Sequence, residues 1–453
     1  MKNTILCSLI VVLMSGCSGG DGWTYLFNGN DLAGWVKRGG AAEFKAENGE
    51  IIGISRAGTG STFLCTEKEY GDFILEFELM VDTALNSGVQ IRSHSRSEVR
   101  DGTEFDRIYG YQVEVDPSKR GWSAGIYDEA RNGWLYPVTP YNPAAVTAFK
   151  NHEWNCYRVE AIDNNVKTWL NGVPVADLLV DFDDSGIIAL QVHSINVITK
   201  PWTEGKAVRW RNMRIMTKNL EANRKTDTSP VYQVNVIPNC LSEREKEEGW
   251  MLLFDGKTTT GWRGALMDAM PERGWSVKEG TIETLPKDES GGGRDIVSID
   301  KFSNFELVFD FKLTEGANSG VKYYVTENVY ANGALGLEYQ VLDDAKHPDA
   351  NMGRDGNRRL ASLYDLLPAT GKRFNGIGQW NKGRVVAKNN HIEHWLNNIK
   401  VLEYERGSDE YRKAVAESKF SKMDNFGEAA EGHILLQYHN DRVFFRNIKI
   451  KKL

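Results

Sequence analysis

The chain has 453 residues, of which 41% are hydrophobic and 26% are charged, a composition typical of a globular protein of two or three domains. The net charge of −7 disfavours nucleic acid as the main partner, because phosphate binding requires a basic surface. The 13 Trp and 17 Tyr residues suit either the flat faces of sugar rings or the core of a β-sandwich.

The N-terminal residues have the pattern of an export signal. Lys2 supplies a positive charge, and the stretch 5–14 is mostly apolar but too short to span a bilayer. The sequence Met-Ser-Gly-Cys at 14–17 then resembles a bacterial lipobox, with Met14 where leucine is commoner. This resemblance implies a lipoprotein signal peptide at 1–16 and a lipid on Cys17, which would anchor the protein in the cell envelope, on the periplasmic side or at the outer-membrane surface. An ordinary cleaved signal is the alternative.

A series of short motifs occurs twice along the chain in the same order. The paired motifs begin at residues 26 and 253, 34 and 261, 86 and 318, 110 and 336, 154 and 380, 169 and 395, 190 and 436, and 211 and 446. Such a series indicates a duplicated domain. We therefore expect one domain at 22–217, a linker at 218–248 and a second domain at 249–453.

The segments between these motifs predict strands. Residues 73–79 and 305–311 alternate apolar and acidic side chains, as half-buried strands do. Helix is scarce: a capping box at 242–245 begins one short helix in the linker, and residues 410–418 are a second candidate. The pattern predicts an all-β chain of two tandem jelly-roll or lectin-like β-sandwich domains joined by a short helical linker.

The motifs of the second copy also match a known family. The matching segments lie at 253–257, 318–320, 336–344, 363–366, 379–381, 394–397, 437–439 and 445–447, and together they cover nearly all of the second copy. They resemble the 3-keto-disaccharide hydrolase family. The first copy matches more loosely, because Gln112 and Glu114 stand where the second has Glu338 and Gln340, and because it carries an insertion around 199–206.

The resemblance implies a jelly-roll fold and cleavage of 3-keto-glycosides or 3-keto-disaccharides. A ketone at C3 makes the C2 proton acidic, so a base can remove that proton, the C1 substituent can leave by elimination, and water can add to the product. Such a site needs a base, a stabiliser for the enolate and an acid for the leaving group. A conventional glycoside hydrolase and a non-catalytic glycan-binding lipoprotein are the alternatives, and the second of these shares the expected fold.

Polar residues that alternate along the predicted strands would share one face, which is either a sugar site or a solvated outer surface. The catalytic candidates are His439, Glu338 and Lys322. We expect His439 to act as base or acid, because imidazole titrates near neutrality, and either Lys322 or a metal ion to hold the enolate. The substrate-binding candidates are Gln340, Tyr324, Gln437 and Asp343 in the second copy, and Arg92, Glu114 and His193 in the first.

No cofactor is indicated with certainty. Asp343, Asp344, His347 and Asp349 form either a divalent-metal site or a polar loop, and no CxxC motif occurs that would favour a thiolate zinc site. The expected partners are a 3-keto-oligosaccharide or glycoside and, through the N-terminal lipid, the membrane, with no nucleic acid. Because the second copy keeps the family motifs, we expect it to hold the chemistry and the first copy to bind sugar or to support the second.

Overall fold

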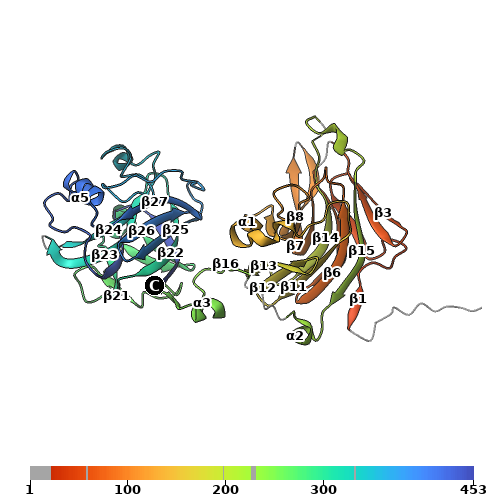
Figure 1. Cartoon of the computed structure of the whole chain (residues 1–453), viewed down its shortest axis with the longest axis horizontal. Coiled ribbons are helices and arrows are strands. Elements are labelled where there is room, and N and C mark those ends of the chain that lie inside the picture. Colours follow the sequence, from red (N-terminus) through yellow and green to blue (C-terminus); the bar gives the residue numbers. More distant parts are fainter. Residues whose placement is uncertain (1–21, 58–59, 101, 197, 226–230, 331–332) are drawn as a thin grey trace, which may run out of the picture. The chain divides into compact units, whose positions relative to one another are not determined.

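The computed structural model describes residues 22–57, 60–100, 102–196, 198–225, 231–330 and 333–453. The chain divides into two compact units, one ending at Ile237 and the other beginning at Pro238 (Figure 1). The expected lipidation site, Cys17, lies outside the described residues, so the lipoprotein signal stays a prediction. None of the helices within the described ranges is long and apolar enough to cross a membrane.

The first unit is a sandwich of two β-sheets. In its described part, one sheet has the order β16-β13-β12-β11-β6-β15-β4-β3, with β1 also paired to β15, and the other has the order β10-β9-β8-β7-β14-β5-β2. The strands are β1 (Trp23–Tyr25), β2 (Trp35–Gly39), β3 (Glu43–Glu47), β4 (Glu50–Ile54), β5 (Thr62–Tyr70), β6 (Phe73–Val81), β7 (Ser87–Arg100), β8 (Thr103–Val115), β9 (Ile126–Glu129), β10 (Gly133–Tyr136), β11 (Asn155–Ile162), β12 (Asn165–Leu170), β13 (Val173–Leu179), β14 (Gly186–Val192), β15 (Ala207–Met216) and β16 (Gln233–Asn235). The helical elements are α1 (Val138–Tyr141), η1 (Pro143–Thr147), η2 (Pro201–Thr203) and α2 (Leu220–Asn223).

The second unit is also a sandwich. Its described strands form one sheet of order β19-β20-β29-β22-β25-β26-β27, with β17 paired to β29, and another of order β18-β21-β28-β23-β24. The strands are β17 (Trp250–Leu252), β18 (Trp262–Gly264), β19 (Trp275–Lys278), β20 (Thr281–Thr284), β21 (Ile296–Phe302), β22 (Phe305–Leu313), β23 (Asn318–Tyr330), β24 (Gly333–Leu342), β25 (Asn381–Lys388), β26 (His391–Leu396), β27 (Ile399–Glu405), β28 (Gly432–Leu436) and β29 (Val443–Lys452). The helical elements are α3 (Glu243–Glu247), α4 (Lys287–Ser290), η3 (Pro348–Asn351) and α5 (Asp409–Ala416). The predicted all-β fold of two sandwiches is therefore confirmed.

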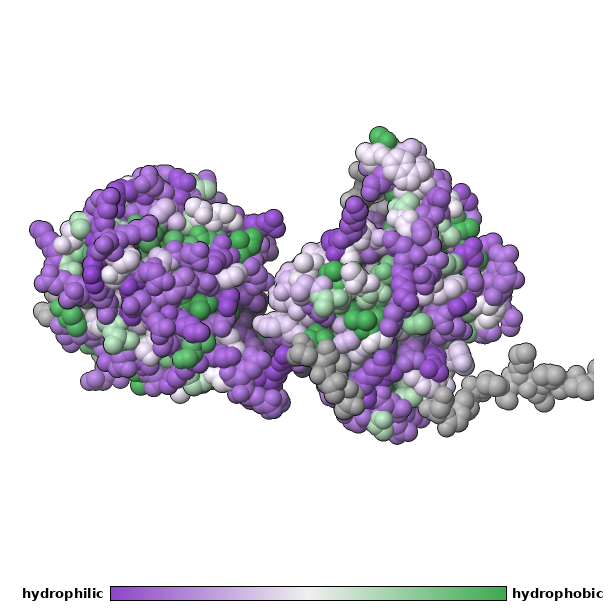
Figure 2. Space-filling view, viewed as in Figure 1, coloured by the Kyte–Doolittle hydropathy of each residue, from purple (hydrophilic) through white to green (hydrophobic). Residues whose placement is uncertain are grey.

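Alternation along the strands builds each core. The inward side chains are Phe73, Leu75, Phe77, Leu79 and Val81 on β6, and Phe305, Leu307, Phe309, Phe311 and Leu313 on β22. Successive strand residues point to opposite faces, so the intervening Glu76 and Glu78 lie outside the core and form ion pairs with arginines of β11 and β15. The surface drawn in Figure 2 is accordingly mostly hydrophilic, with small separate hydrophobic patches.

The segment expected as a linker, 218–248, contributes an element to each unit. β16 pairs in parallel with β13 of the first unit, whereas α3 belongs to the second. The predicted capping box is present: the Ser242 hydroxyl accepts a hydrogen bond from the Glu245 amide at 3.0 Å, and the Glu245 carboxylate accepts one from the Ser242 amide at 3.0 Å. The helix expected at 410–418 is α5.

The two units place their shared motifs at matching positions. The strands that begin with the repeated Asn-Ser-Gly motif, β7 and β23, each lie between two partners, β8 and β14 in the first unit and β24 and β28 in the second. The Ser87 and Ser319 hydroxyls donate hydrogen bonds of 2.7 Å to the carbonyls of Gln191 and Gln437, respectively. The predicted duplication is thus confirmed, and any residue on β7 or β8 can be compared directly with its counterpart on β23 or β24.

Candidate active site

A buried ion pair lies on the β23-β24 pair of the second unit. Lys322 on β23 and Glu338 on β24 are direct cross-strand neighbours, and they are only 8% and 6% exposed. The Lys322 ammonium lies 3.8 Å from the Glu338 carboxylate and 3.7 Å from that of Asp295. A charged pair at this depth is costly to maintain, which favours a functional role for it.

Gly320 makes room for the Glu338 carboxylate. A Cβ atom at Gly320 would lie 2.2 Å from Glu338 Oε1, which is far inside van der Waals contact. The first unit repeats this arrangement, because a Cβ at Gly88 would lie 2.3 Å from the side chain of Gln112. The glycine of the repeated Asn-Ser-Gly motif therefore allows the side chain at position 338 or 112 to lie flat across the neighbouring strand.

The segment after β24 covers the edge of the sheet beside Glu338. The Tyr364 amide donates to the Glu338 carbonyl at 3.0 Å, and the Ala361 amide donates to the Gln340 carbonyl at 2.8 Å. Tyr364 is thereby placed beside Glu338, and the Lys419 ammonium lies 4.2 Å from the Tyr364 ring centroid. The site thus has a second positive charge close to the carboxylate.

His439 follows the end of β28 and forms a dyad with Asp441. Its Nδ1 atom lies 3.6 Å from Asp441 Oδ2, and its side chain is 46% exposed. Asp441 is itself held by the backbone amide of Asn318, which donates a hydrogen bond of 3.1 Å to the Asp441 carboxylate. Asp295 accepts a hydrogen bond of 2.8 Å from the Tyr438 amide, so the carboxylate that contacts Lys322 also positions the segment carrying His439.

The pKa values of Glu338 and His439 are both raised above their ordinary values. Burial raises the pKa of Glu338 above its usual value, and the positive charges of Lys322 and Lys419 oppose that rise. Asp441 raises the pKa of His439, and the charge of Glu338 adds to this effect. The arrangement therefore offers a carboxylate of increased basicity and an imidazole that stays protonated to higher pH.

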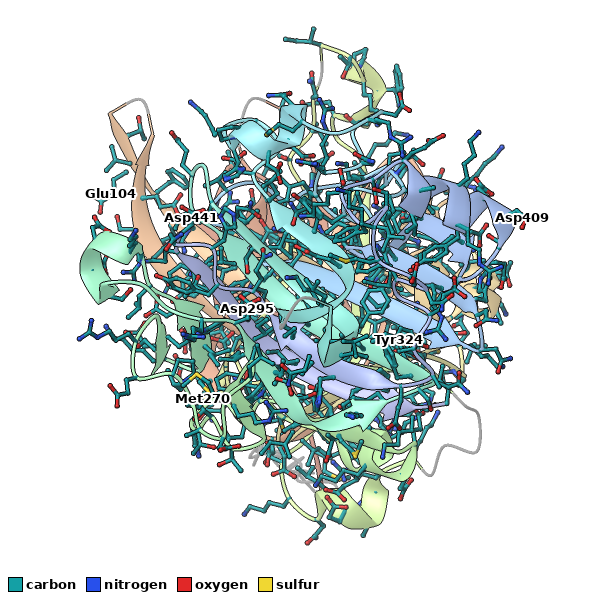
Figure 3. All side chains as sticks on the ribbon, turned by 90° about the vertical axis from the view of Figure 1, so that its left-hand side faces the viewer. Glu104, Met270, Asp295, Tyr324, Asp409 and Asp441 are labelled. Atoms are coloured by element: carbon teal, nitrogen blue, oxygen red, sulfur yellow. The ribbon has the colours of Figure 1, made fainter. Side chains whose placement is uncertain are left out.

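Two predicted binding residues, one in each unit, do not lie on the face of the sheet that carries the polar candidates. Tyr324 and its counterpart Arg92 lie at β-bulges with positive φ values of 52° and 44°. The bulge shifts the alternation by one residue, so both side chains turn inward, each 1% exposed. In Figure 3, Tyr324 lies on the other side of Asp295 from Asp441.

The inward side chains of Tyr324 and Arg92 have structural roles instead. The Tyr324 hydroxyl donates to the Ser303 carbonyl at 2.5 Å. Arg92 forms an ion pair with Asp72 at 2.8 Å and donates to backbone carbonyls of neighbouring strands and turns. The prediction that these two residues contact substrate is therefore wrong.

The other predicted residues of the second unit lie at or near the Lys322–Glu338 pair. Gln340 follows Glu338 on the same face and is 1% exposed; its side-chain oxygen has no hydrogen-bond partner among the described residues. The backbone amide of Gln437 donates a hydrogen bond of 2.9 Å to the Gly320 carbonyl. The Asp343 carboxylate is occupied, because it accepts the amides of Gly316 and Ala345 at 2.8 and 3.0 Å. Asp343 therefore fixes a turn, whereas Gln340 is enclosed beside Glu338 with an unsatisfied side-chain oxygen.

The first unit lacks the charged pair. Gln90 and Gln112 occupy the positions of Lys322 and Glu338, and the Gln90 amide donates to the Gln112 amide oxygen at 2.7 Å. Glu114 is buried at the position of Gln340 and accepts hydrogen bonds from Asn86 and Gln112. His193 is exposed, and its ring contacts the Ser194 carbonyl at 2.7 Å. At the described positions that match Lys322 and Glu338, this unit therefore carries two neutral amides in place of the ion pair.

The carboxylates of the segment that could form either a divalent-metal site or a polar loop are engaged by other groups of the protein. Asp343 caps a turn, Asp344 pairs with Lys372 at 2.7 Å, and Asp349 pairs with Arg358 at 2.9 Å. Ligand atoms of His347, His439 and Asp441 do lie within 4.8 Å of one another. Two imidazoles and one carboxylate suit a transition-metal ion better than calcium, so these three residues would hold such an ion if one binds.

Several residues of the site were not predicted from the sequence. Lys419 and Asp441 lie outside the segments used as candidates, and Asp295 follows a glycine run that reads only as a turn. Tyr364 stands within a family motif at 363–366, so that motif was the one signal that could have identified it.

Comparison with known proteins places the chain in one family. The family described as 3-keto-alpha-glucoside-1,2-lyase-like domain matches residues 22–216 and again residues 249–451. A 3-keto-disaccharide hydrolase of Bacteroides thetaiotaomicron is 36% identical over 233 residues, which are 46% of this chain and 79% of that protein. A solved structure from Parabacteroides distasonis, assigned provisionally as a glycosyl hydrolase, is 30% identical with a TM-score of 0.43, over 48% of this chain and 100% of that one. A second structure from that organism, with the same provisional assignment, is 28% identical with a TM-score of 0.35, over 45% and 99% of the two chains.

Proposed function

We propose that this chain, which belongs to the 3-keto-α-glucoside-1,2-lyase-like family, cleaves the glycosidic bond of 3-keto-glycosides in its second unit. Family membership and the Bacteroides relative support a carbohydrate hydrolase. The observation that carries the assignment to the second unit is the Lys322–Glu338 pair beside His439 and Asp441, which the first unit replaces with two glutamines.

Proton removal at C2 is the first step of the proposed reaction. Glu338 is the base, because a buried carboxylate with a raised pKa binds a proton more strongly than an exposed one. The electron pair of the C2–H bond forms the C2–C3 double bond, and the C3 carbonyl oxygen becomes an enolate oxygen. Lys322 lies beside the base, so its ammonium can stabilise the negative charge on that oxygen.

Departure of the C1 substituent is the second step. The enolate returns its electrons to re-form the C3 carbonyl, the C1–C2 double bond forms, and the bond from C1 to the glycosidic oxygen breaks. His439 donates a proton to this oxygen, since the Asp441 carboxylate keeps the imidazole protonated to higher pH. Water then adds across C1 and C2 and gives the free 3-keto-sugar.

A conventional glycoside hydrolase is the second candidate. Asp295 and Glu338 both approach the Lys322 ammonium, at 3.7 and 3.8 Å, and paired carboxyls are what such hydrolases use. In that case the sugar would not need a ketone. A glycan-binding protein without turnover is the third candidate, because it would share the fold.

Two substrates distinguish these functions. The purified chain is incubated with a 3-keto-glucoside and with the same glucoside before oxidation, and release of the aglycone is measured. We expect cleavage of the 3-keto form alone. Cleavage of the unoxidised glucoside would indicate a conventional hydrolase, and binding without cleavage of either would indicate a glycan-binding protein.

We further propose that the chain is a lipoprotein of the cell envelope, acylated on Cys17. This proposal rests on the lipobox-like sequence at 14–17 and the apolar stretch before it.

A further inference from the structure

The first unit carries a row of side chains that crosses four strands on one face. Gln90 on β7 pairs with Gln112 on β8, Gln112 pairs with Tyr127 on β9, and Tyr127 pairs with Trp134 on β10. Directly paired residues of neighbouring strands project to the same face of a sheet. The row begins at the positions that correspond to Lys322 and Glu338 and continues onto two aromatic rings.

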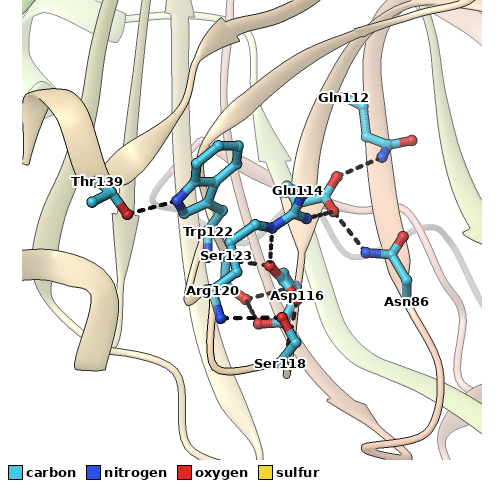
Figure 4. Close-up of polar contacts among 9 residues, drawn as sticks. All are labelled: Asn86, Gln112, Glu114, Asp116, Ser118, Arg120, Trp122, Ser123 and Thr139. Atoms are coloured by element: carbon cyan, nitrogen blue, oxygen red, sulfur yellow. Dashed lines mark hydrogen bonds and ion pairs between the residues drawn. The ribbon is translucent and has the colours of Figure 1, made fainter. Parts of the chain in front are cut away.

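The polar end of the row is built from amides. Gln90 donates to Gln112 at 2.7 Å, and Gln112 donates to the Glu114 carboxylate at 2.9 Å. Asn86 donates to the other oxygen of Glu114 at 2.7 Å (Figure 4). Amides that replace a charged pair at the same positions can form hydrogen bonds with hydroxyl groups, but they cannot act as the base that removes a proton, and they carry no positive charge.

Gln191 adds an unsatisfied amide to this face. It lies on β14 opposite Gly88, whose other cross-strand neighbour is Glu114. Gln191 is 0% exposed, and neither its side-chain nitrogen nor its oxygen has a hydrogen-bond partner among the described residues. A buried amide without a partner is costly, and a bound ligand with hydroxyl groups would satisfy it.

The other end of the row is an aromatic wall. Trp122 and Trp134 lie edge to face with ring centroids 4.7 Å apart, and Tyr127 lies 5.2 Å from Trp134. The Arg120 guanidinium contacts both indole rings, at 4.6 and 4.9 Å. The Trp122 indole donates to the Thr139 hydroxyl at 2.7 Å, which fixes its orientation (Figure 4). All three rings are half-buried, so part of each remains accessible.

The charge of Arg120 is already neutralised within the wall. Its guanidinium lies 2.7 Å from Asp116 and 3.4 Å from Glu114. These two carboxylates outnumber the one cation, so an anionic ligand gains little here. A ligand with hydroxyl groups on one side and an apolar C–H face on the other fits both the amides and the rings.

We propose that the first unit is a non-catalytic sugar-binding domain whose site, formed by Gln112, Glu114, Gln191, Trp122 and Trp134, binds an unoxidised neutral hexopyranose unit of a glycan. The pyranose face packs against the indoles, and its hydroxyls bond to the amides and to Glu114. This function is separate from the bond cleavage proposed for the second unit.

Binding is tested in the full-length chain with His439→Ala, so that turnover in the second unit does not interfere. Maltose, cellobiose and trehalose serve as neutral probes and digalacturonate as an acidic one, with affinity measured by titration calorimetry. Trp134→Ala should weaken binding of a neutral disaccharide about tenfold or more. Trp154→Ala is the matched control, since Trp154 is also half-buried and also stacked by an arginine, Arg211 at 4.0 Å, but lies outside this row.

Three results would overturn the proposal: no neutral disaccharide binds, binding is unchanged in Trp134→Ala, or only digalacturonate binds. Circular dichroism of each variant checks that the fold is retained, and Trp122→Phe provides a milder second variant. Cleavage of the 3-keto-glucoside by Trp134→Ala in the otherwise unmodified chain should equal that of the parent protein. A failed binding test and a failed cleavage test are therefore separate outcomes.

Discussion

Converting the ion pair of the second unit into the amide pair of the first tests the roles of its two residues. The double substitution Lys322→Gln with Glu338→Gln reproduces the Gln90–Gln112 pair, in which one amide donates to the other at 2.7 Å. Gly320 leaves the space that a side chain at 338 needs, as Gly88 does for Gln112. The variant removes both the proposed base and the proposed enolate stabiliser. We therefore expect turnover to fall by about 10⁴-fold, since each role contributes about 10²-fold or more.

The stability of the same variants tests whether the pair is coupled. Lys322→Gln alone leaves the Glu338 carboxylate buried without its nearest cation, which should lower the free energy of unfolding by about 3 kcal/mol. The double variant leaves no buried charge at these two positions, so its free energy of unfolding should lie within about 1 kcal/mol of the parent protein.

Denaturant unfolding and initial rates on a 3-keto-glucoside measure both effects. We expect the double variant to be more stable than Lys322→Gln and to lack turnover. Retained turnover in a folded double variant would refute the roles given to Lys322 and Glu338. A double variant less stable than Lys322→Gln would refute the coupling.

Three further predictions concern His439, metal and localisation. His439→Ala should lower turnover about 10²-fold, while His193→Ala in the first unit should leave turnover unchanged. Because the acid must be protonated, activity should fall as pH rises through the raised pKa of His439. Asp441→Asn removes the group that raises this pKa, so it should move the fall in activity to lower pH. A protonated imidazole cannot bind a metal ion, so dialysis against EDTA should leave activity intact. If EDTA instead abolishes activity and a transition-metal ion restores it, His347, His439 and Asp441 would be metal ligands. Cys17→Ser should abolish lipid labelling and release the chain from the membrane fraction, and unchanged membrane association would contradict acylation at this residue.

The sequence was sufficient to predict the fold and part of the site. Strict alternation in β6 and β22 indicates which side chains build the core, and the repeated Asn-Ser-Gly motif locates equivalent strands in the two units. Lys322, Glu338 and Gln340 were found because their strands keep this alternation up to the bulge.

The misplaced residues lie where local geometry breaks the pattern. A positive φ is uncommon for tyrosine and arginine, so nothing in the sequence around Tyr324 or Arg92 indicates a bulge. Lys419 reaches the site through a tertiary contact between segments far apart in the chain, which alternation along a single strand cannot reveal. Asp441 lies only two residues after His439, but it is held there by the backbone amide of the distant Asn318.

In the proposed reaction, the glycosidic bond breaks through loss of the C2 proton. Cleavage of a 3-keto-glucoside in D₂O, followed by NMR of the released sugar, tests this directly, with the 3-keto-sugar incubated without protein as the control for spontaneous exchange. We expect deuterium at C2 of the product above the control level, since elimination removes the original proton and hydration of the C1–C2 double bond adds a deuteron from solvent. A cleaved product that keeps its C2 proton would contradict elimination and would assign the chain to direct hydrolysis.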